Sequence, residues 1–310
     1  MHPQDYIFID FPVKDYLKGN NMTEVNVREP LSIPMRFLRK LPGFSRCISN
    51  TKEQDGWTDA CRNAKRIILF DTFAHYSQYC SRIEKTAPRD ARLILYMLNP
   101  AFFSDNYKNI SSRWEIWTFT KEDAMQHGFK YGATFFNPLL LDYTAVPPDS
   151  KQANAVTDLL FVGTNKGRKP LLSRLQNKLQ HEDIACDFRI VDNFKSLYNR
   201  EYSREVSYLR LCKLICNSNA ILDVVQNGQT GMTLRIMEGI LFGKKIVTTN
   251  QSLRHYSDFD QCGNIYELTA DNINGLAAFL KSPATPYPQW MKEKYSFCNW
   301  LQRLENNIEA

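Results

Sequence analysis

The sequence lacks the long apolar runs and the cysteine patterns that mark membrane, secreted and zinc-binding proteins. No apolar run reaches the roughly 20 residues that a membrane-spanning helix needs, and the first residues do not show the basic and then apolar pattern of a signal peptide. The eight cysteines include no Cys-x-x-Cys pair and no histidines at zinc-ligand spacing. We therefore predict a cytoplasmic protein with reduced cysteines, no metal site and no other cofactor.

The sequence also has no large excess of charge of one sign, since the net charge of +6 is modest and spread along the chain. This argues against a nucleic-acid partner. One exception is residues 35–46, where Arg36, Arg39, Lys40 and Arg46 alternate with apolar side chains and no acid is present. This segment could rest on an anionic membrane surface, or it could be a solvated basic face beside ordinary core residues. The sequence leaves both interpretations open.

Two series of short apolar runs alternate with helical segments in these 310 residues, which exceed what one hydrophobic core usually organises. A proline-containing stretch without periodicity, residues 144–157, separates the two series. Such alternation is typical of parallel sheets covered by helices. We predict an α/β fold with domains at residues 1–150 and 151–290, and a final helix in residues 291–310 that packs back toward the first domain.

Ligands of such sheets bind beyond the carboxyl ends of the strands, so two domains facing each other would form a binding cleft. In the second domain, FVGTNKGRKP (161–170) indicates a strand, a glycine turn and a helix start. Gly163 would let backbone amides approach a phosphate, and Arg168 would hold phosphate oxygens with two parallel hydrogen bonds. The segment matches neither the GxGxxG nor the Walker A pattern, and a simple strand-to-helix turn also explains it.

The segment GQTGMTLRIMEGILFGKKIVTTN (228–250) carries more information. It predicts a helix that begins near Thr230 and Gly231 and stops at Gly243, followed by a strand. The free amides and the positive dipole end of a helix suit a diphosphate. We therefore expect the start of this helix to contribute to a phosphate site.

Arg235 and Glu238 are polar residues on this otherwise apolar helix, and their spacing of three places them on one face. Counted along the helix from Gly231, Glu238 lies about 10 Å away, which matches the reach from a nucleotide's phosphates to its ribose hydroxyls. An ordinary Arg–Glu pair on a solvated face is the competing interpretation. Gly239 costs about 1 kcal/mol inside a helix and so indicates that something approaches closely there.

The order RIMEG (235–239), then Gly243 and KKIVTTN (244–250), is similar to the nucleotide-sugar-binding segment of group 1 glycosyltransferases, which have the GT-B fold. More closely, residues 228–250 resemble bacterial transferases encoded with lipopolysaccharide O-antigen and capsule genes, distantly similar to CgeB-like proteins. Three further segments fit this family: LILYMLNP (93–100), FTKEDAMQHGFKY (119–131) and EKYSFCNWLQRL (293–304). The resemblance covers about residues 65–305.

The resemblance implies a donor site in the second domain. Its residues are, in chain order, Gly163, Arg168, Thr230, Gly231, Arg235 and Glu238. Glu238 would bind the donor ribose, the two arginines would neutralise the diphosphate, Gly163 would open the donor loop, and the amides near Thr230 would complete the phosphate site. Related transferases often carry an acid eight residues before the ribose-binding glutamate. This chain has Thr230 there, so retention or inversion at the sugar is not assigned.

A general base would be needed in the first domain if the reaction inverts. Asp71 ends a predicted strand and His75 follows about one helical turn later, so either could take a proton from an acceptor hydroxyl. Asn99, at the end of the next strand, is a comparable candidate. A helix cap for Asp71 and an ordinary imidazole for His75 are the competing interpretations.

The sequence thus predicts a metal-independent glycosyltransferase that moves a sugar from a nucleoside diphosphate donor to a growing, lipid-linked bacterial surface glycan, at the inner face of the cytoplasmic membrane. A nucleotide-sugar epimerase of the same fold and a non-catalytic nucleotide-sugar-binding subunit are the alternatives. The three differ in their response to an acceptor: a transferase releases nucleotide faster when acceptor is added, an epimerase converts the donor alone, and a binding subunit does neither. Replacing Glu238 by alanine is expected to weaken donor binding with little loss of fold.

Overall fold

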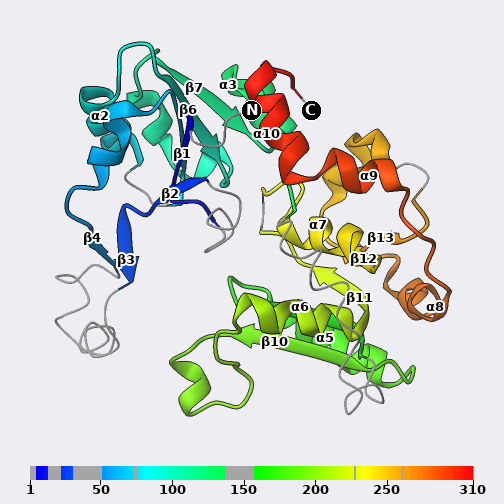
Figure 1. Cartoon of the computed structure of the whole chain (residues 1–310). Helices are drawn as coiled ribbons and strands as arrows, with labels where there is room; N and C mark the ends of the chain where they lie inside the picture. Colours follow the sequence, from blue (N-terminus) through cyan, green and yellow to red (C-terminus); the bar gives the residue numbers. More distant parts are fainter. Residues whose placement is uncertain are drawn as a thin grey trace. The chain divides into compact units, whose positions relative to one another are not determined.

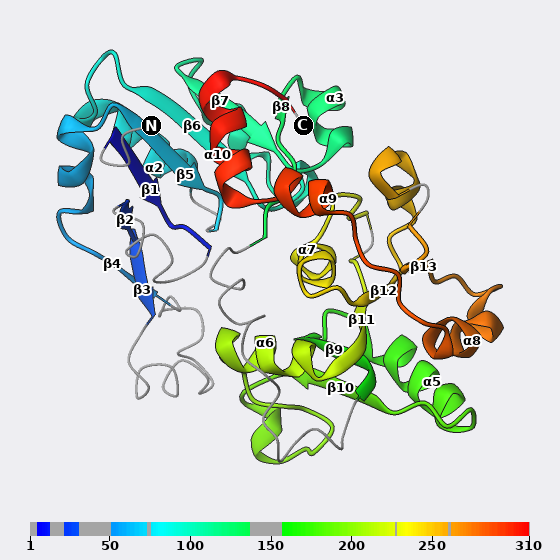
Figure 2. The same ribbon diagram turned by 45° about the vertical axis from the view of Figure 1, so that its right-hand side comes forward.

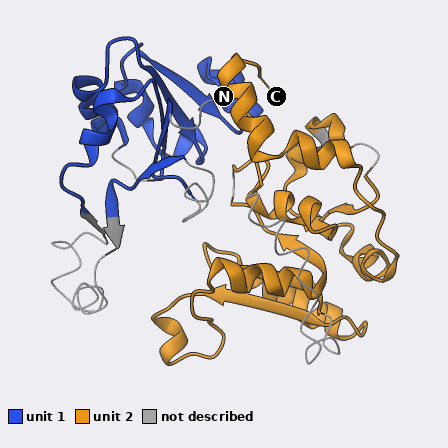
Figure 3. Cartoon of the chain, in the orientation of Figure 1, with its two compact units in different colours: residues 1–131 blue, residues 132–310 orange. Residues whose placement is uncertain are grey.

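The computed structural model describes residues 5–12, 22–30, 51–72, 76–136, 157–226, 228–259 and 262–309. The chain divides into two compact units, residues 1–131 and 132–310 (Figure 3). The predicted domain boundary at residue 150 falls outside the described residues, as do His75 and the basic segment 35–46. Every described helix is too short or too polar to span a bilayer.

The first unit is built on a parallel sheet of six strands in the order β2-β1-β5-β6-β7-β8 (Figures 1 and 2). These strands and a separate antiparallel pair, β3 and β4, are β1 (Tyr6–Ile9), β2 (Thr23–Val25), β3 (Arg28–Pro30), β4 (Thr51–Glu53), β5 (Arg66–Phe70), β6 (Arg92–Met97), β7 (Trp114–Thr118) and β8 (Lys130–Tyr131). The chain passes from β1 to β2 on one side and later adds β5 on the other side of β1. The topological switch point of this sheet therefore lies between β1 and β5.

Helices cover this sheet where the sequence shows helical periodicity. The helix α2 (Tyr76–Thr86) buries Tyr76, Tyr79, Cys80 and Ile83 in the core of the unit, at the spacing of one helix face. The helix α3 (Lys121–His127) forms within the segment FTKEDAMQHGFKY (119–131), and the short helix η3 (Trp57–Asn63) precedes β5. The helical segments predicted on either side of β6 and β7 are thus confirmed.

The second unit has a parallel sheet of five strands in the order β10-β9-β11-β12-β13. Its strands are β9 (Thr157–Thr164), β10 (Cys186–Val191), β11 (Ser218–Asp223), β12 (Lys245–Thr248) and β13 (Ile265–Glu267). Its helices are α5 (Lys169–Gln180), α6 (Tyr208–Cys216), α7 (Leu234–Leu241), α8 (Leu276–Lys281), α9 (Gln289–Lys294) and α10 (Phe297–Asn306). The chain leaves β9 for β10 on one side and then returns to place β11 on the other, so the switch point lies between β9 and β11.

Alternate side chains of the central strands pack against helices on opposite faces of this sheet. Leu159 and Leu222 lie in one apolar cluster with residues of α5 and α8, whereas Leu160 and Ile221 lie in another with residues of α6. Because side chains of a strand point alternately to its two faces, these clusters are the two sides of the sheet. The continuous apolar runs of the sequence thus reflect strands that are buried on both faces.

The final helix α10 follows Ser296, whose hydroxyl accepts a hydrogen bond from the Asn299 amide at 3.2 Å. It buries Phe297 and Trp300, and both rings contact Phe135, which follows the last strand of the first sheet in the sequence. Phe135 belongs to the second compact unit, as does α10. The closing helix predicted from its apolar spacing is therefore present.

Candidate functional site

The carboxyl edge of the second sheet holds the residues predicted for the donor site. The strand β9 leads through residues 165–168 into α5, and β11 ends at Asp223 and leads into α7. These two strands flank the switch point, where open α/β sheets bind their ligands. The turn before α5 is made at Gly167, whose φ of 81° lies in the left-handed region that favours glycine. The predicted strand, glycine turn and helix are confirmed.

Gly163 lies inside β9, where it pairs with Ile190, so the loop begins after Thr164 and not at this glycine. A methyl group at Gly163 would lie 3.1 Å from the Phe161 ring and 3.6 Å from Nη1 of Arg168. The glycine therefore leaves space beside the arginine side chain. This differs from the expectation that Gly163 opens the donor loop, because the sheet pairing continues for one residue beyond it.

Arg168 occupies the residue before α5, and its guanidinium is only partly satisfied by hydrogen bonds. Its Nη1 donates to the Thr164 carbonyl at 3.3 Å, and its buried Nε has no hydrogen-bond partner among the described residues. Burial lowers the pKa of Arg168, the charge of Asp223 raises it, and the nearby charge of Arg235 lowers it further. Two guanidinium groups within electrostatic reach, one with a spare donor, form a site suited to an anion.

Arg235 and Glu238 share a face of α7, as their spacing predicted, but that face is not solvated. Glu238 is 3% exposed and Arg235 is 27% exposed, and the two form an ion pair. The second carboxylate oxygen of Glu238 accepts a hydrogen bond from the Tyr208 hydroxyl at 3.3 Å. Burial lowers the pKa of Arg235, but the charge of Glu238 outweighs this and raises it. The pair is therefore largely buried, and Glu238 favours the charged form of Arg235.

Asp223 is a site residue that sequence reasoning missed. Its buried carboxylate at the end of β11 accepts hydrogen bonds from the Thr233 and Thr248 hydroxyls, each at 2.9 Å. Burial raises the pKa of Asp223, although both hydroxyls and the charges of Arg235 and Arg168 oppose this. The position of an acid at the end of the run AILD, like that of Asp71 after RIILF, is a signal that could have identified it. Asp223 joins the ends of β11 and β12 to the start of α7, within electrostatic reach of both arginines.

The start of α7 was predicted wrongly. The helix begins at Leu234, after Thr233, whose side chain accepts a hydrogen bond from the Ile236 amide at 3.4 Å. Thr230 and Gly231 precede it in a loop, and their carbonyls accept hydrogen bonds from the Asn250 side chain at 3.2 and 3.1 Å. Asn250 follows β12 and lies 19 and 20 residues away in sequence, so no local pattern reveals this contact.

Two consequences follow from the later helix start. The distance counted along a helix from Gly231 to Glu238 does not apply, since the residues between them are partly a loop. The amides at the start of the helix are those after Thr233 and not those near Thr230. The shared face of Arg235 and Glu238 is unaffected, because both lie within the eight residues of α7.

Gly239 allows α7 to pack directly on β12. A methyl group at this position would lie 2.5 Å from Cγ1 and 2.7 Å from Cδ1 of Ile246, which is fully buried. The group that approaches this glycine is thus a core side chain of the same unit. Gly239 is explained by helix-to-sheet packing and needs no ligand.

Replacing Gly239 by alanine should lower the free energy of unfolding by about 1 to 3 kcal/mol, because it overpacks this contact. In a double-mutant cycle, the combined loss with Ile246→Ala should be smaller than the sum of the two single losses. Gly263→Ala is the matched control, since its methyl group would meet only Thr285 Oγ1, at 3.7 Å. Strict additivity in urea denaturation would show that Ile246 is not the source of the strain.

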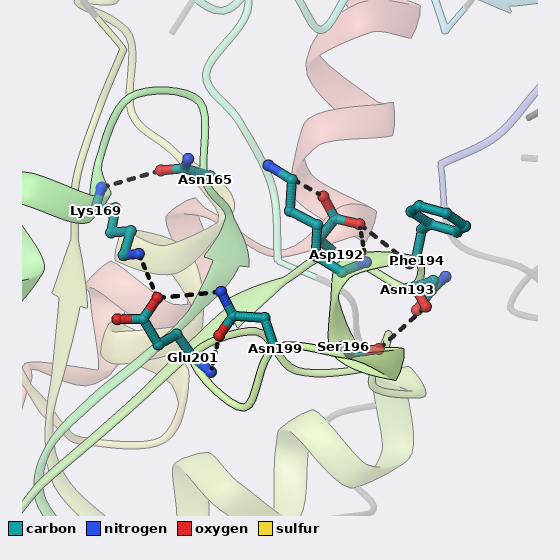
Figure 4. Close-up of polar contacts among 9 residues, drawn as sticks. Asn165, Lys169, Asp192, Asn193, Phe194, Ser196, Asn199 and Glu201 are labelled. Atoms are coloured by element: carbon teal, nitrogen blue, oxygen red, sulfur yellow. Dashed lines mark hydrogen bonds and ion pairs between the residues drawn. The ribbon is translucent and has the colours of Figure 1, made fainter. Parts of the chain in front are cut away.

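The loop between β10 and α6 is fixed to the start of α5 by polar contacts (Figure 4). Lys169 pairs with Glu201 at 2.6 Å, and the Asn199 side-chain amide donates to the same carboxylate at 3.3 Å. The backbone amide of Lys169 donates to Asn165 Oδ1 at 3.0 Å, and Asp192 accepts from two amides of its own loop. This network holds the loop beside residues 165–168, which carry the candidate anion site.

In the first unit, Asp71 follows β5 and both of its carboxylate oxygens are engaged. Oδ1 accepts from the Leu98 amide at 2.5 Å, and Oδ2 accepts from the Asn99 amide at 3.2 Å. The Asn99 side chain in turn donates to the Asp71 carbonyl at 3.1 Å. Burial raises the pKa of Asp71 to about 6, although these hydrogen bonds lower it. The contacts join the ends of β5 and β6, so the structure brings Asp71 and Asn99 together.

No protein-family model matches the sequence, and no curated protein matches it. Solved structures do resemble this one along its whole length. The UDP-GlcNAc 2-epimerase of Methanocaldococcus jannaschii, solved with UDP-GlcNAc and UDP, superposes with a TM-score of 0.51 at 12% identity, over 97% of this chain and 99% of that one. A glycosyltransferase involved in avilamycin A biosynthesis gives a TM-score of 0.50 at 12% identity, over 97% of this chain and 96% of that one.

At 12% identity these likenesses concern the fold alone. Together with the two parallel sheets and their helices, they confirm the predicted α/β fold of the GT-B type. The roles of the individual site residues stay predictions, and so does the finer resemblance to O-antigen, capsule and CgeB-like transferases.

Proposed function

We propose that the second unit binds a nucleoside diphosphate sugar and that the protein is a glycosyltransferase. The observation that carries this proposal is the group formed by Arg168, Arg235 and Glu238 at the switch point of the second sheet. Two guanidinium groups suit the oxygens of a diphosphate, and a carboxylate suits the paired hydroxyls of a ribose. The diphosphate and the ribose of a nucleotide thus each have a chemical partner within one unit.

The diphosphate would bind to Arg168 and Arg235. The unpaired Nε of Arg168 offers a hydrogen bond that no described residue takes. Asp223 lies within electrostatic reach of both arginines, whose charges oppose the effect of burial on its pKa. On this proposal, the arginines stabilise the diphosphate as it leaves the sugar, without a metal ion.

The ribose would bind to Glu238. An ionised carboxylate has about four lone-pair positions, and Arg235 and Tyr208 occupy two of them. A ribose would use the remaining positions or replace the Tyr208 hydroxyl. The ion pair with Arg235 fixes the carboxylate in place, which lowers the entropy lost when the nucleotide binds.

The acceptor we propose is a lipid-linked bacterial surface glycan of the lipopolysaccharide, O-antigen or capsule class, bound by the first unit. The support is the sequence resemblance described above. Asp71 and His75, chosen from their positions at and just after a strand end, are the groups proposed for proton removal. Peripheral contact with an anionic membrane through residues 35–46 belongs to the same proposal. Sedimentation with anionic liposomes tests this contact, and indifference to anionic lipid would exclude it.

A nucleotide-sugar epimerase is the second candidate, because one of the structural neighbours is a UDP-GlcNAc 2-epimerase. The two activities differ in their need for an acceptor. A transferase releases nucleoside diphosphate faster when acceptor is added, whereas an epimerase converts the donor alone. A non-catalytic binding subunit would do neither.

Nucleotide binding can be measured by thermal shift with UDP, GDP, dTDP, CMP and their sugars. A ligand present at 100 times its dissociation constant stabilises a protein by about 2.7 kcal/mol, which should raise the melting temperature by several degrees. Arg168→Met should reduce the shift, and Arg174→Met, at an exposed arginine of the following helix α5, should leave it unchanged. The donor site would be wrong if no nucleotide stabilised the wild-type protein.

A further inference from the structure

Asp10 is a buried carboxylate in an unusual backbone conformation at the end of β1. It is 5% exposed, and its φ of 54° lies in the left-handed region. Its amide donates to the Val25 carbonyl at 2.9 Å, and its Oδ1 accepts from the Val27 amide at 2.8 Å. Its Oδ2 is buried and has no hydrogen-bond partner among the described residues.

Among the described residues, only one of the two carboxylate oxygens of Asp10 takes part in a hydrogen bond. Burial raises the pKa of Asp10 to about 6, the Val27 amide and the charge of Arg28 lower it, and the charge of Glu24 raises it. An asparagine would keep the bond to Val27 and also tolerates a left-handed backbone, without placing a charge in the core. The hydrogen bond to Val27 therefore explains Oδ1, and no described residue explains the need for Oδ2.

The position of Asp10 suggests that role. Asp10 directly follows Ile9, which pairs with Leu69 of β5, and Asp71 lies two residues beyond Leu69. The two acids thus end the two strands that flank the switch point of the first sheet. Ligands of open α/β sheets bind there. Both oxygens of Asp71 already accept backbone hydrogen bonds, so Asp10 is the acid of the two with an oxygen to spare.

We propose that Asp10 is the general base that accepts the proton of the attacking hydroxyl through its Oδ2. This inference rests on the proposed transferase function and replaces Asp71 in that role. The hydroxyl oxygen forms a bond to the anomeric carbon of the donor while its proton moves to Asp10. The bond from that carbon to the diphosphate oxygen breaks, and the electron pair leaves with the nucleoside diphosphate. A single displacement of this kind inverts the sugar. Asp71 then holds the ends of β5 and β6 in place.

Turnover of a sugar nucleotide tests this, with water as the attacking hydroxyl when no glycan is supplied. The probe is the sugar nucleotide of the thermal-shift panel that stabilises the wild-type protein most, and the readout is released nucleoside diphosphate. Asp10→Asn should lower kcat at least 100-fold, in the range typical of a lost general base, and leave the donor dissociation constant unchanged. The wild-type kcat should rise with pH and level off above about 6, and this rise should disappear in Asp10→Asn.

Asp90→Asn, an exposed acid of the same unit, is the control and should retain wild-type turnover. Thermal unfolding of Asp10→Asn verifies that the fold is intact, since the substitution keeps the oxygen that binds Val27. Turnover of Asp10→Asn within twofold of wild type would overturn the inference, as would a wild-type protein that binds the donor and never releases nucleotide. A wild-type protein that binds no sugar nucleotide would instead refute the proposed function itself, on which this inference depends.

Discussion

Glu238→Ala should lower the free energy of unfolding by about 3 kcal/mol, because it leaves Arg235 as a largely buried charge without its partner. The Tyr208 hydroxyl also loses its acceptor. From the sequence alone, Arg235 and Glu238 form either a solvated pair or a site in which the Glu238 carboxylate binds ligand, and its removal spares the fold. Burial of Glu238 to 3% exposure changes that expectation, so binding tests with the alanine variant would mix stability and affinity.

A double variant separates the two effects. Arg235→Met with Glu238→Met should recover most of the stability lost in Glu238→Ala, since apolar side chains of similar size can replace a buried ion pair at little cost. It should bind no nucleoside diphosphate. Urea denaturation measures the stability, and a double variant as unstable as the single one would mean that the pair contributes through something other than charge.

Glu238→Gln is the variant suited to the ribose role, because it keeps an oxygen for Tyr208 and removes only the charge. Hydrogen bonds to a charged group contribute about 1.5 to 3 kcal/mol, so nucleotide affinity should fall about 10- to 100-fold. Affinity for inorganic pyrophosphate, which has no ribose, should change little. The control is Glu293→Gln, an exposed acid of the same unit. Equal affinity of wild type and Glu238→Gln for UDP and GDP would remove Glu238 from the ribose site.

Stability should fall as the pH rises from about 4 to about 7, and Asp10 should account for about 3 kcal/mol of this change. Burial raises its pKa from 3.8 to about 6, and a tenfold change in an acid dissociation constant corresponds to about 1.4 kcal/mol. Between pH 3.8 and about 6, native Asp10 holds a proton that the unfolded chain has released. Its contribution to stability is therefore complete below pH 3.8 and is lost as the pH rises through about 6. The pKa of Asp71 is raised in the same way, so this residue should add a similar amount.

Urea denaturation at several pH values measures this slope. In Asp10→Asn, the loss of stability between about pH 4 and pH 7 should be about 3 kcal/mol smaller than in the wild type. In Asp90→Asn, it should equal that of the wild type. The opposite effect of Glu115 lies at lower pH: burial raises its pKa, but Arg92 and Lys130 outweigh this and lower the pKa to about 2. Its stabilisation is therefore lost below 4.5, mostly outside the measured range. Identical slopes for wild type and Asp10→Asn would show that Asp10 ionises in the fold as it does in the unfolded chain.

The sequence revealed those parts of the site that depend on neighbours in the chain. Helical spacing placed Arg235 and Glu238 on one face, and Gly243 marked the end of their helix, where the backbone has a φ of 64°. The glycine turn before α5 was also visible, because it depends on residues within one turn of each other. The start of α7 was placed too early, because Thr230 and Gly231 bind the distant Asn250 side chain and the helix begins only after its cap Thr233.

By itself the sequence determined two series of buried strands alternating with helices, and hence two parallel sheets, because apolar periodicity is a local property of the chain. Only the tertiary structure decided how charged groups are satisfied. Glu238 meets Tyr208 from 30 residues away, and both oxygens of Asp71 meet a loop that follows another strand. Asp10 binds the Val27 amide through one oxygen, and its other oxygen has no partner in the part of the chain that the structure describes. Burial and hydrogen-bond partners arise between segments distant in sequence, and these fix which acids can act on a ligand.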